Sequence, residues 1–349
     1  MCVPTPLNHH REPDMTYVEQ TTRTVSKNMR EGQMVILEST TYPGTTEELI
    51  IPILEEGSGL SAEKDFYVAY SPEREDPGNE NFNTAKIPKV VGAHGEDALK
   101  LACALYDTAI VQTIPVSDCK TAEAVKLTEN IFRSVNIAMV NELKVIYQPM
   151  GIDVHEVLDA AGTKPFGFMK FTPGPGLGGH CIPIDPFYLT WKAREVEQPT
   201  RFIELAGEIN TDMPRYVVRK TLEAMNYHKK ALNGSKVLLV GLAYKPNVDD
   251  DRESPTYKLM ELFEEMGAEV SYYDSYVPKI KPSREYAHYA GRESVAWDKD
   301  TVSSFDAVVI STNHSDVNYR ELGEWASCIV DTRNAMNGYT TKEGQLFKA

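Results

Sequence analysis

The stretch Lys236-Val-Leu-Leu-Val240, which runs directly into Gly241-Leu-Ala-Tyr-Lys-Pro246, decides the fold of the last third of the chain. An uninterrupted apolar run that ends in glycine is typical of a strand buried on both faces of a parallel sheet. A helical pattern follows near residues 255–266, and further strand patterns lie at 269–273, 307–310 and 328–331. Strands that alternate with helices predict a doubly wound α/β domain, which we expect over residues 231–349.

The first third of the chain alternates in the same way. Strand patterns at 34–38, 66–70, 89–92 and 110–114 are separated by helical periodicity, as in 17–30 and 97–106. We therefore expect a parallel sheet with helical crossovers over residues 1–115. Polar residues just past the carboxyl ends of such strands line the ligand crevice, and Thr40 and Glu73 hold such positions. Ordinary turn and capping chemistry explains these two residues equally well.

The middle of the chain, residues 116–230, is predicted to be helical. Residues 122–147 have apolar side chains at helical spacing and contain neither Gly nor Pro. A second long helix is expected over residues 203–225, with an interruption near Pro214. The predicted fold class is therefore α/β, with two Rossmann-like domains joined by a helical middle domain and the first of them incomplete.

Composition excludes several classes of protein. At 349 residues the chain is long enough for two or three domains, and its formal net charge of −15 argues against broad attraction to nucleic acid or anionic lipid. No apolar run is long enough to span a bilayer, and the first residues lack the pattern of a signal peptide. The five cysteines are widely spaced and form no Cys-x-x-Cys pair, so we expect neither a disulfide framework nor a metal site. A reducing cytoplasm fits this cysteine usage best.

One cysteine lies in an unusual setting. Residues 172–189 read Thr-Pro-Gly-Pro-Gly-Leu-Gly-Gly-His-Cys-Ile-Pro-Ile-Asp-Pro-Phe-Tyr-Leu, which places Cys181 after several glycines and prolines. Such a segment is a poor helix and a poor strand, and it leaves peptide N–H groups open near the sulfur. The thiol, the open backbone and Asp185 four residues later favour covalent chemistry on a carbonyl carbon. The alternative is a buried cysteine that packs as a small hydrophobe.

Polar groups on the predicted middle helix could assist chemistry at the Cys181 thiol. Lys126 and Asn130 are four residues apart and share a face, where an ammonium and an amide can stabilise a developing oxyanion. A cation near Cys181 would also favour its thiolate, and Asp185 could orient or deprotonate a water. The alternatives are an exposed helix face for Lys126 and Asn130 and helix capping for Asp185. Glu123 and Glu129, on the same helix, are expected to be solvated.

Three further residues are candidates for substrate contact. His180 adjoins Cys181 and could tune the thiol, contact substrate or simply pack. Lys245 and Arg252 follow the strand at 236–240 and could bind phosphate, or belong to a solvated loop.

Taken together, these motifs resemble the UDP-glucose/GDP-mannose dehydrogenase family, NAD-dependent oxidoreductases that oxidise the C6 alcohol of a nucleotide sugar to a carboxylate. The resemblance covers nearly the whole chain. It rests on Val3-Pro-Thr-Pro-Leu7, Ser39-Thr-Thr41, Tyr70-Ser-Pro-Glu-Arg74, Ala122-Glu-Ala-Val-Lys126 with Asn130, residues 173–185 and residues 241–255. The segments at 71–78 and 178–186 look most like the UDP-N-acetylglucosamine 6-dehydrogenase branch, with UDP-N-acetylmannosamine and UDP-glucose enzymes as alternatives. Pro77 stands where UDP-glucose enzymes carry a second glutamate, which argues against plain UDP-glucose.

The resemblance implies a four-electron oxidation. One NAD oxidises the alcohol to an aldehyde, Cys181 traps the aldehyde as a thiohemiacetal, a second NAD oxidises this to a thioester, and water releases the acid. It implies that Lys126 and Asn130 hold the oxyanion, that Asp185 and Thr40 position water, and that Glu73 lies beside the substrate or its proton path. It assigns cofactor contacts to Thr5, Thr40, Glu73 and Arg252, and substrate contacts to Lys126, Asn130, Gly178, His180 and Lys245.

The resemblance also implies a cytoplasmic homodimer or larger assembly, joined through the middle helices, that makes precursors of surface polysaccharides. The family's strand-Gly-x-Gly-x-x-Gly-helix unit does not occur at the start of this chain. We expect it to lie upstream of Met1 and the chain as given to bind NAD poorly, which keeps a non-catalytic nucleotide-sugar binder as an alternative. A cysteine hydrolase is disfavoured because no histidine is placed as a general base for Cys181.

Overall fold

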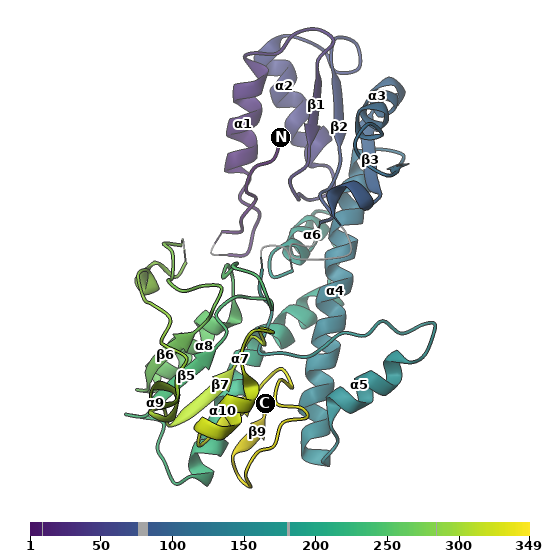
Figure 1. Cartoon of the computed structure of the whole chain (residues 1–349). Helices are drawn as coiled ribbons and strands as arrows, with labels where there is room; N and C mark the ends of the chain where they lie inside the picture. Colours follow the sequence, from purple (N-terminus) through teal and green to yellow (C-terminus); the bar gives the residue numbers. More distant parts are fainter. Residues whose placement is uncertain (9, 76–82, 180–181, 284) are drawn as a thin grey trace. The chain divides into compact units, whose positions relative to one another are not determined.

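The structure is a computed structural model of the chain, and it describes residues 1–8, 10–75, 83–179, 182–283 and 285–349 (Figure 1). These residues form two compact units. Unit 1 comprises Met1–Arg133 and Ile184–Glu204, and unit 2 comprises Ser134–Pro183 and Leu205–Ala349. Pro77, His180 and Cys181, on which several expectations rest, lie outside the described residues.

Unit 1 is built on a four-stranded sheet with the order β1-β2-β3-β4. The strands are β1 (Met34–Leu37), β2 (Tyr67–Tyr70), β3 (Lys89–His94) and β4 (Thr113–Pro115), and the helices are α1 (Thr16–Ser26), α2 (Ile51–Ser58), α3 (Glu96–Tyr106), α6 (Asp185–Glu195) and the first half of α4 (Cys119–Tyr147). The β1–β2 and β3–β4 pairs are parallel, as expected. The β2–β3 pair is antiparallel, so the expectation of a wholly parallel sheet is wrong for this pair; antiparallel neighbours need no crossover helix between them.

Both faces of the unit 1 sheet are covered, because side chains alternate along each strand. Figure 1 shows α1 and α2 on one side of β1 and β2 and α3 on the other. One face carries Val35, Leu37, Val68, Tyr70 and Val90, which pack with α1 and α2. The other carries Ala69, Val91 and Ala93, which pack with Ala98 and Ala102 of α3. The small residues on the second face let α3 approach the sheet closely.

The first residues of the chain lie along β1. The amino group of Met1 donates to the carbonyl oxygen of Ile36, and the N–H of Glu38 donates to the carbonyl oxygen of Met1, at 2.5 and 3.0 Å. This is the hydrogen-bond pattern of a parallel strand pair. The Ser39 hydroxyl then binds both the N–H and the carbonyl oxygen of Val3 at 2.8 Å. The Val3-Pro-Thr-Pro-Leu7 motif is thereby attached to the carboxyl end of β1.

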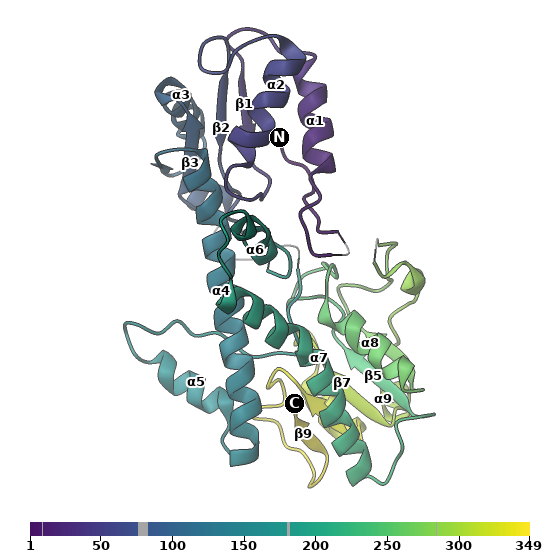
Figure 2. The ribbon, with the colours of Figure 1, turned by 180° about the vertical axis from the view of Figure 1, so that it is seen from behind.

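Unit 2 carries a five-stranded parallel sheet with the order β6-β5-β7-β8-β9. Its strands are β5 (Lys236–Val240), β6 (Glu269–Tyr273), β7 (Ala307–Ile310), β8 (Ile329–Asp331) and β9 (Leu346–Lys348), and its helices are the second half of α4, α5 (Val154–Gly162), most of α7 (Arg201–Tyr227), α8 (Pro255–Glu265), α9 (Lys299–Ser303) and α10 (Tyr319–Trp325). Val237, Leu239 and Val309 pack with α7 and α8, whereas Leu238, Val308 and Ile310 pack with α9 and α10. Figure 2 shows α7 crossing the first of these faces. The doubly wound fold predicted from the 236–240 strand is confirmed.

Two long helices differ from their expected form. α7 is continuous through Pro214, so the predicted interruption is wrong; ten of its residues, Pro214 included, are buried, and this packing outweighs the lost hydrogen bond. α4 spans 29 residues, and its two halves belong to different compact units. Among the described residues, no helix is both long and apolar enough to cross a bilayer.

Candidate active site

Lys126 and Asn130 lie one turn apart on α4, within unit 1, and both are buried, with 8% and 4% of their surface exposed. The Lys126 ammonium donates to the carbonyl oxygen of Glu73 at 2.6 Å. The Asn130 amide donates to the carboxylate of Asp185 at 2.6 Å. An exposed, solvated helix face is therefore not the environment of these two side chains.

Asp185 is the first residue of α6 and is also buried, with 4% exposed. Its carboxylate binds the Asn130 amide, and no side-chain capping bond is made at this helix start, so the capping alternative fails. Burial raises the pKa of Asp185 to about 7, against the opposing effects of Lys126 and Asn130. A buried carboxyl that exchanges its proton near neutral pH, beside an ammonium and an amide, is suited to general acid–base chemistry.

Glu73 contacts Lys126 through its main-chain carbonyl oxygen rather than through its carboxylate. Its carboxylate accepts the N–H groups of Arg74 and Glu75 at 2.8 and 2.9 Å and lies 3.5 Å from the Lys89 ammonium. Its side chain is 47% exposed, whereas its carbonyl oxygen binds Lys126. In this structure the Ser-Pro-Glu-Arg motif therefore positions the Lys126 ammonium with a main-chain oxygen.

The Ser39-Thr-Thr41 motif follows β1 directly. Thr40 is half-buried and Thr41 is buried. The hydroxyls of Thr41 and of Tyr70, which ends β2, are buried and make no hydrogen bond within the described part of the chain. These groups lie at the carboxyl ends of two adjacent parallel strands, the edge at which doubly wound sheets bind their ligands.

Glu123 is fully buried, so the expectation that it is solvated is wrong. It accepts the N–H of Gly44 at 2.6 Å and the N–H and hydroxyl of Thr46 at 2.9 and 2.7 Å. It thereby supplies acceptors to the π-helical turn Thr46–Ile50 that leads into α2. Burial raises the pKa of Glu123 to about 7, although these donors oppose the shift. Helical spacing does not reveal this role, because the donors come from 77 and 79 residues earlier in the chain.

In unit 2, the end of the glycine-proline segment lies against the loop that follows β5. A Cβ on Gly178 would meet Tyr244 at 2.6 Å, and the N–H of Gly179 donates to the carbonyl oxygen of Arg252 at 3.2 Å. The Arg252 guanidinium binds the Asp250 carboxylate through two nitrogens, at 2.8 and 2.6 Å. Lys245, in the same loop, is half-buried. Glycine at 178 is thus required for the close approach of these two loops.

Two residues that the sequence motifs did not indicate, Asn141 and Arg333, contact the other end of that segment. The N–H of Gly174 donates to the side-chain oxygen of Asn141 at 2.9 Å, and the Arg333 guanidinium lies beside Gly174, where a Cβ would displace it. Asn141 follows Asn130 by eleven residues, close to three helical turns, so the same spacing argument would have found it. No sequence pattern around Arg333 indicates that it contacts this segment.

Three of the other cysteines are not activated. Cys119 and Cys328 are buried, and burial raises the pKa of both thiols, to about 11 for Cys328. The pKa of Cys2 is also raised, by burial and by its hydrogen bond to Glu38. A raised pKa keeps a thiol protonated and poorly nucleophilic, so these three cysteines are disfavoured as nucleophiles.

Family models match the chain in three parts. The NAD binding domain of the UDP-glucose/GDP-mannose dehydrogenase family matches residues 1–110, its central domain matches 120–212, and its UDP binding domain matches 238–338. The chain belongs to the UDP-glucose/GDP-mannose dehydrogenase family. It is an NAD-dependent nucleotide-sugar dehydrogenase, as the motifs predicted.

Individual members of the family cover most of the chain. It is 36% identical over 338 residues to UDP-N-acetyl-D-glucosamine 6-dehydrogenase of Pseudomonas aeruginosa, which covers 95% of this chain and 78% of that protein. It is 37% identical over 339 residues to UDP-N-acetyl-D-mannosamine dehydrogenase of Pyrococcus horikoshii, over 96% and 76% of the two chains. The solved structure of the Pyrococcus horikoshii UDP-D-ManNAc dehydrogenase matches with a TM-score of 0.88 at 34% identity, over 99% of this chain and 79% of that one.

Proposed function

We propose that this dehydrogenase oxidises the C6 alcohol of a UDP-N-acetylhexosamine to the uronate, with UDP-N-acetylglucosamine as the preferred substrate. Relatives named for that activity are 36% and 35% identical to the chain. UDP-N-acetylmannosamine is the alternative, because relatives named for it are similarly close, at 37% and 34%. Pro77 continues to argue against UDP-glucose.

The observation that carries this proposal is the buried cluster of Lys126, Asn130 and Asp185. Its ammonium and amide are aligned to stabilise negative charge that develops on the oxygen of an aldehyde or thioester. Cys181, four residues before Asp185, supplies the thiol that adds to the aldehyde carbon. In the last step water attacks the thioester, Asp185 takes its proton, and the C–S bond breaks to release the thiolate. A carboxyl with a pKa of about 7 suits that proton transfer.

We propose that the carboxyl edge of β1 and β2 contacts NAD. Thr40 lies just past β1, Glu73 lies just past β2, and Thr5 lies in the segment attached to β1 through Ser39. Arg252, the fourth proposed contact, belongs to unit 2. When bound, NAD supplies the acceptor for the hydride that leaves the sugar C6 carbon. Residues 8–15, which precede α1, contain no glycine, whereas the turn that holds a pyrophosphate at the start of such a helix is rich in glycine.

The reaction stoichiometry tests this function. We expect two NADH for each uronate formed from UDP-N-acetylglucosamine, with lower kcat/KM for UDP-N-acetylmannosamine and much lower for UDP-glucose. The assay follows absorbance of NADH and the acidic product, in the chain as given and in any longer protein that the coding sequence encodes in frame upstream. Binding of the UDP-sugar without NAD binding or NADH formation in both proteins would instead favour a non-catalytic nucleotide-sugar binder.

An exposed apolar stripe on α4 supports the proposed homodimer. Phe132, Met139 and Ile146 recur every seven residues and are 48%, 39% and 42% exposed. A seven-residue apolar repeat on an exposed helix is suited to packing against a second helix. We further propose that the enzyme is cytoplasmic and makes precursors for surface polysaccharides, in keeping with its net charge and cysteine usage.

Placing a charge on this stripe tests the dimer. Met139→Glu is expected to convert the dimer to monomers, because it would bury a carboxylate in an apolar interface. Light scattering coupled to gel filtration measures the mass. Val145→Glu, which adds the same charge at an exposed position about 120° around the same helix, serves as the control and should leave the dimer intact. A wild-type monomer, or a Met139→Glu dimer of unchanged stability, would contradict this interface.

A further inference from the structure

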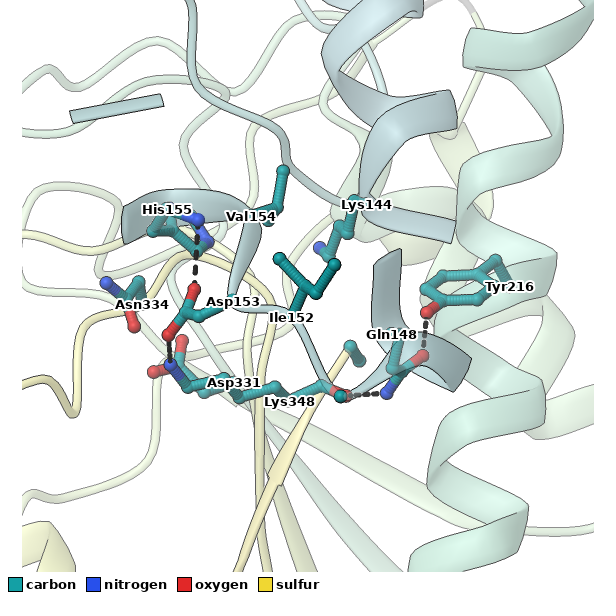
Figure 3. Close-up of a pocket in the computed structure, with 12 residues that line it drawn as sticks. Lys144, Gln148, Ile152, Asp153, Val154, His155, Tyr216, Asp331, Asn334 and Lys348 are labelled. Carbon is teal, nitrogen blue, oxygen red and sulfur yellow. Dashed lines mark hydrogen bonds and ion pairs between the residues drawn. The ribbon is translucent and has the colours of Figure 1, made fainter. Parts of the chain in front are cut away.

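Unit 2 contains a pocket that none of the proposed catalytic residues lines. It has a volume of about 280 Å³ and lies between the ends of α4 and β9, the start of α5, α7 and the turn after β8 (Figure 3). This volume suits a small metabolite rather than a nucleotide sugar. Figure 3 shows the Lys144 side chain running from α4 toward Ile152, with Asp153, His155 and Asn334 on the opposite wall.

The acidic groups of the wall already have partners. Asp153 accepts the N–H of His155 at 2.9 Å and pairs with the Lys348 ammonium. Asp331 accepts two backbone N–H groups of the turn that follows β8, at 2.9 and 2.8 Å. Neither carboxylate therefore needs a cation from outside the protein.

Lys144 is different. It is buried, with 6% exposed, and the one hydrogen bond that its ammonium makes to a described residue is to the carbonyl oxygen of Thr332, at 3.2 Å. Among the described residues, it has no carboxylate oxygen within 4.0 Å. An ammonium has three donors, so two of those on Lys144 have no partner among the residues that the structure describes. The side-chain oxygen of Asn334, on the opposite wall, is likewise buried and has no hydrogen-bond partner in the described part of the chain.

The surroundings of Lys144 disfavour its charge. Burial and the nearby Arg333 lower the pKa of Lys144 to about 7, and Asp331 only partly opposes them. Burial and Lys144 in turn lower the pKa of His155. The charged or titratable groups that face this region are Lys144 of α4, Asp153 and His155 at the start of α5, Tyr216 of α7, Asp331 at the end of β8, Arg333 after β8, Lys348 of β9 and, in the chain as given, the α-carboxylate of Ala349. An added negative charge would relieve the repulsion between Lys144 and Arg333.

We propose that this pocket binds a small anion, a carboxylate or a phosphate, through the Lys144 ammonium. Anionic oxygens would match the two free donors of Lys144, and a hydroxyl or protonated oxygen on the same molecule would match the Asn334 oxygen. A cation is disfavoured by Lys144 and Arg333, and a wholly apolar ligand would leave the same groups unmatched.

Calorimetry of the full chain at pH 7 tests the proposal, with inorganic phosphate and malonate as separate probes. We expect saturable binding with an uptake of up to about half a proton per site, because the anion restores the charge of Lys144. Titrations in buffers of different ionisation enthalpy measure that uptake. Lys144→Met should lower the affinity about 10- to 100-fold and abolish the uptake. Lys170→Met, which removes an exposed lysine paired with Asp159, should change neither.

A second variant keeps the test decisive if Lys144→Met does not fold. Asn334→Asp is nearly isosteric and places a negative charge in the pocket, so it should weaken anion binding at least about tenfold. Asn337→Asp adds the same charge at an exposed position three residues away and is the matched control. Binding of one probe alone would identify the preferred head group. Equal affinity in wild type and Asn334→Asp, or no saturable binding of either probe up to about 20 mM, would overturn the proposal.

Discussion

Cys181→Ala is expected to abolish formation of the uronate, with a loss of at least about 10³-fold in the rate of acid production. The second oxidation requires a tetrahedral carbon that carries a hydride, and only the thiol adduct of the aldehyde supplies it in the proposed reaction. The rate is measured as acid product and as NADH, with the alcohol and with the isolated aldehyde as substrates. The loss should appear with both substrates.

Cys103→Ala is the matched control, because Cys103 is a half-buried thiol of α3 without an assigned role. It should leave acid formation within about threefold of wild type, the range of an ordinary mild substitution. A Cys181→Ala variant that makes acid at the full rate would rule out the covalent route and with it the proposed roles of Lys126 and Asn130.

Asp185→Asn is expected to change activity and stability in opposite directions. Release of the acid should slow about 10²- to 10³-fold, because the water that attacks the thioester loses its proton acceptor. The folded protein holds the Asp185 proton up to about pH 7, whereas an unfolded Asp releases it near its ordinary value of 3.8. Between these two values the folded state binds more protons, so the free energy of unfolding of wild type falls as the pH rises.

The Asp185→Asn variant has an amide at this position, with no proton to lose, so its stability does not fall in this way. Its unfolding free energy should be close to that of wild type near pH 4 and higher by about 2–4 kcal/mol at pH 8. Urea denaturation at pH 4, 6 and 8 measures the difference. Asp212→Asn, a change at an exposed position of α7, should show no such trend. A variant that is less stable than wild type at pH 8 would show that the ionised Asp185 carboxylate stabilises the folded state. It would contradict the inference that this catalytic residue is kept at a cost in stability.

Local sequence patterns predicted most of the elements that carry the site. The apolar runs at 34–38, 66–70 and 236–240 became β1, β2 and β5, because a buried strand requires such runs. The spacing of Lys126 and Asn130 placed both on one face of α4, because a helix repeats every 3.6 residues. The three-residue strand β9 was not predicted, since so short a segment carries too little periodicity.

The sequence by itself determined where strands and helices form, which polar residues share a helix face, and which family the motifs resemble. Only the tertiary structure decided which of those groups are buried and what they bind. Asp185 meets Asn130 across 55 residues, Glu123 meets Thr46 across 77, and Lys144 meets Thr332 across 188. Burial and partner identity set the pKa of each group, and both depend on contacts between distant segments that no local spacing records.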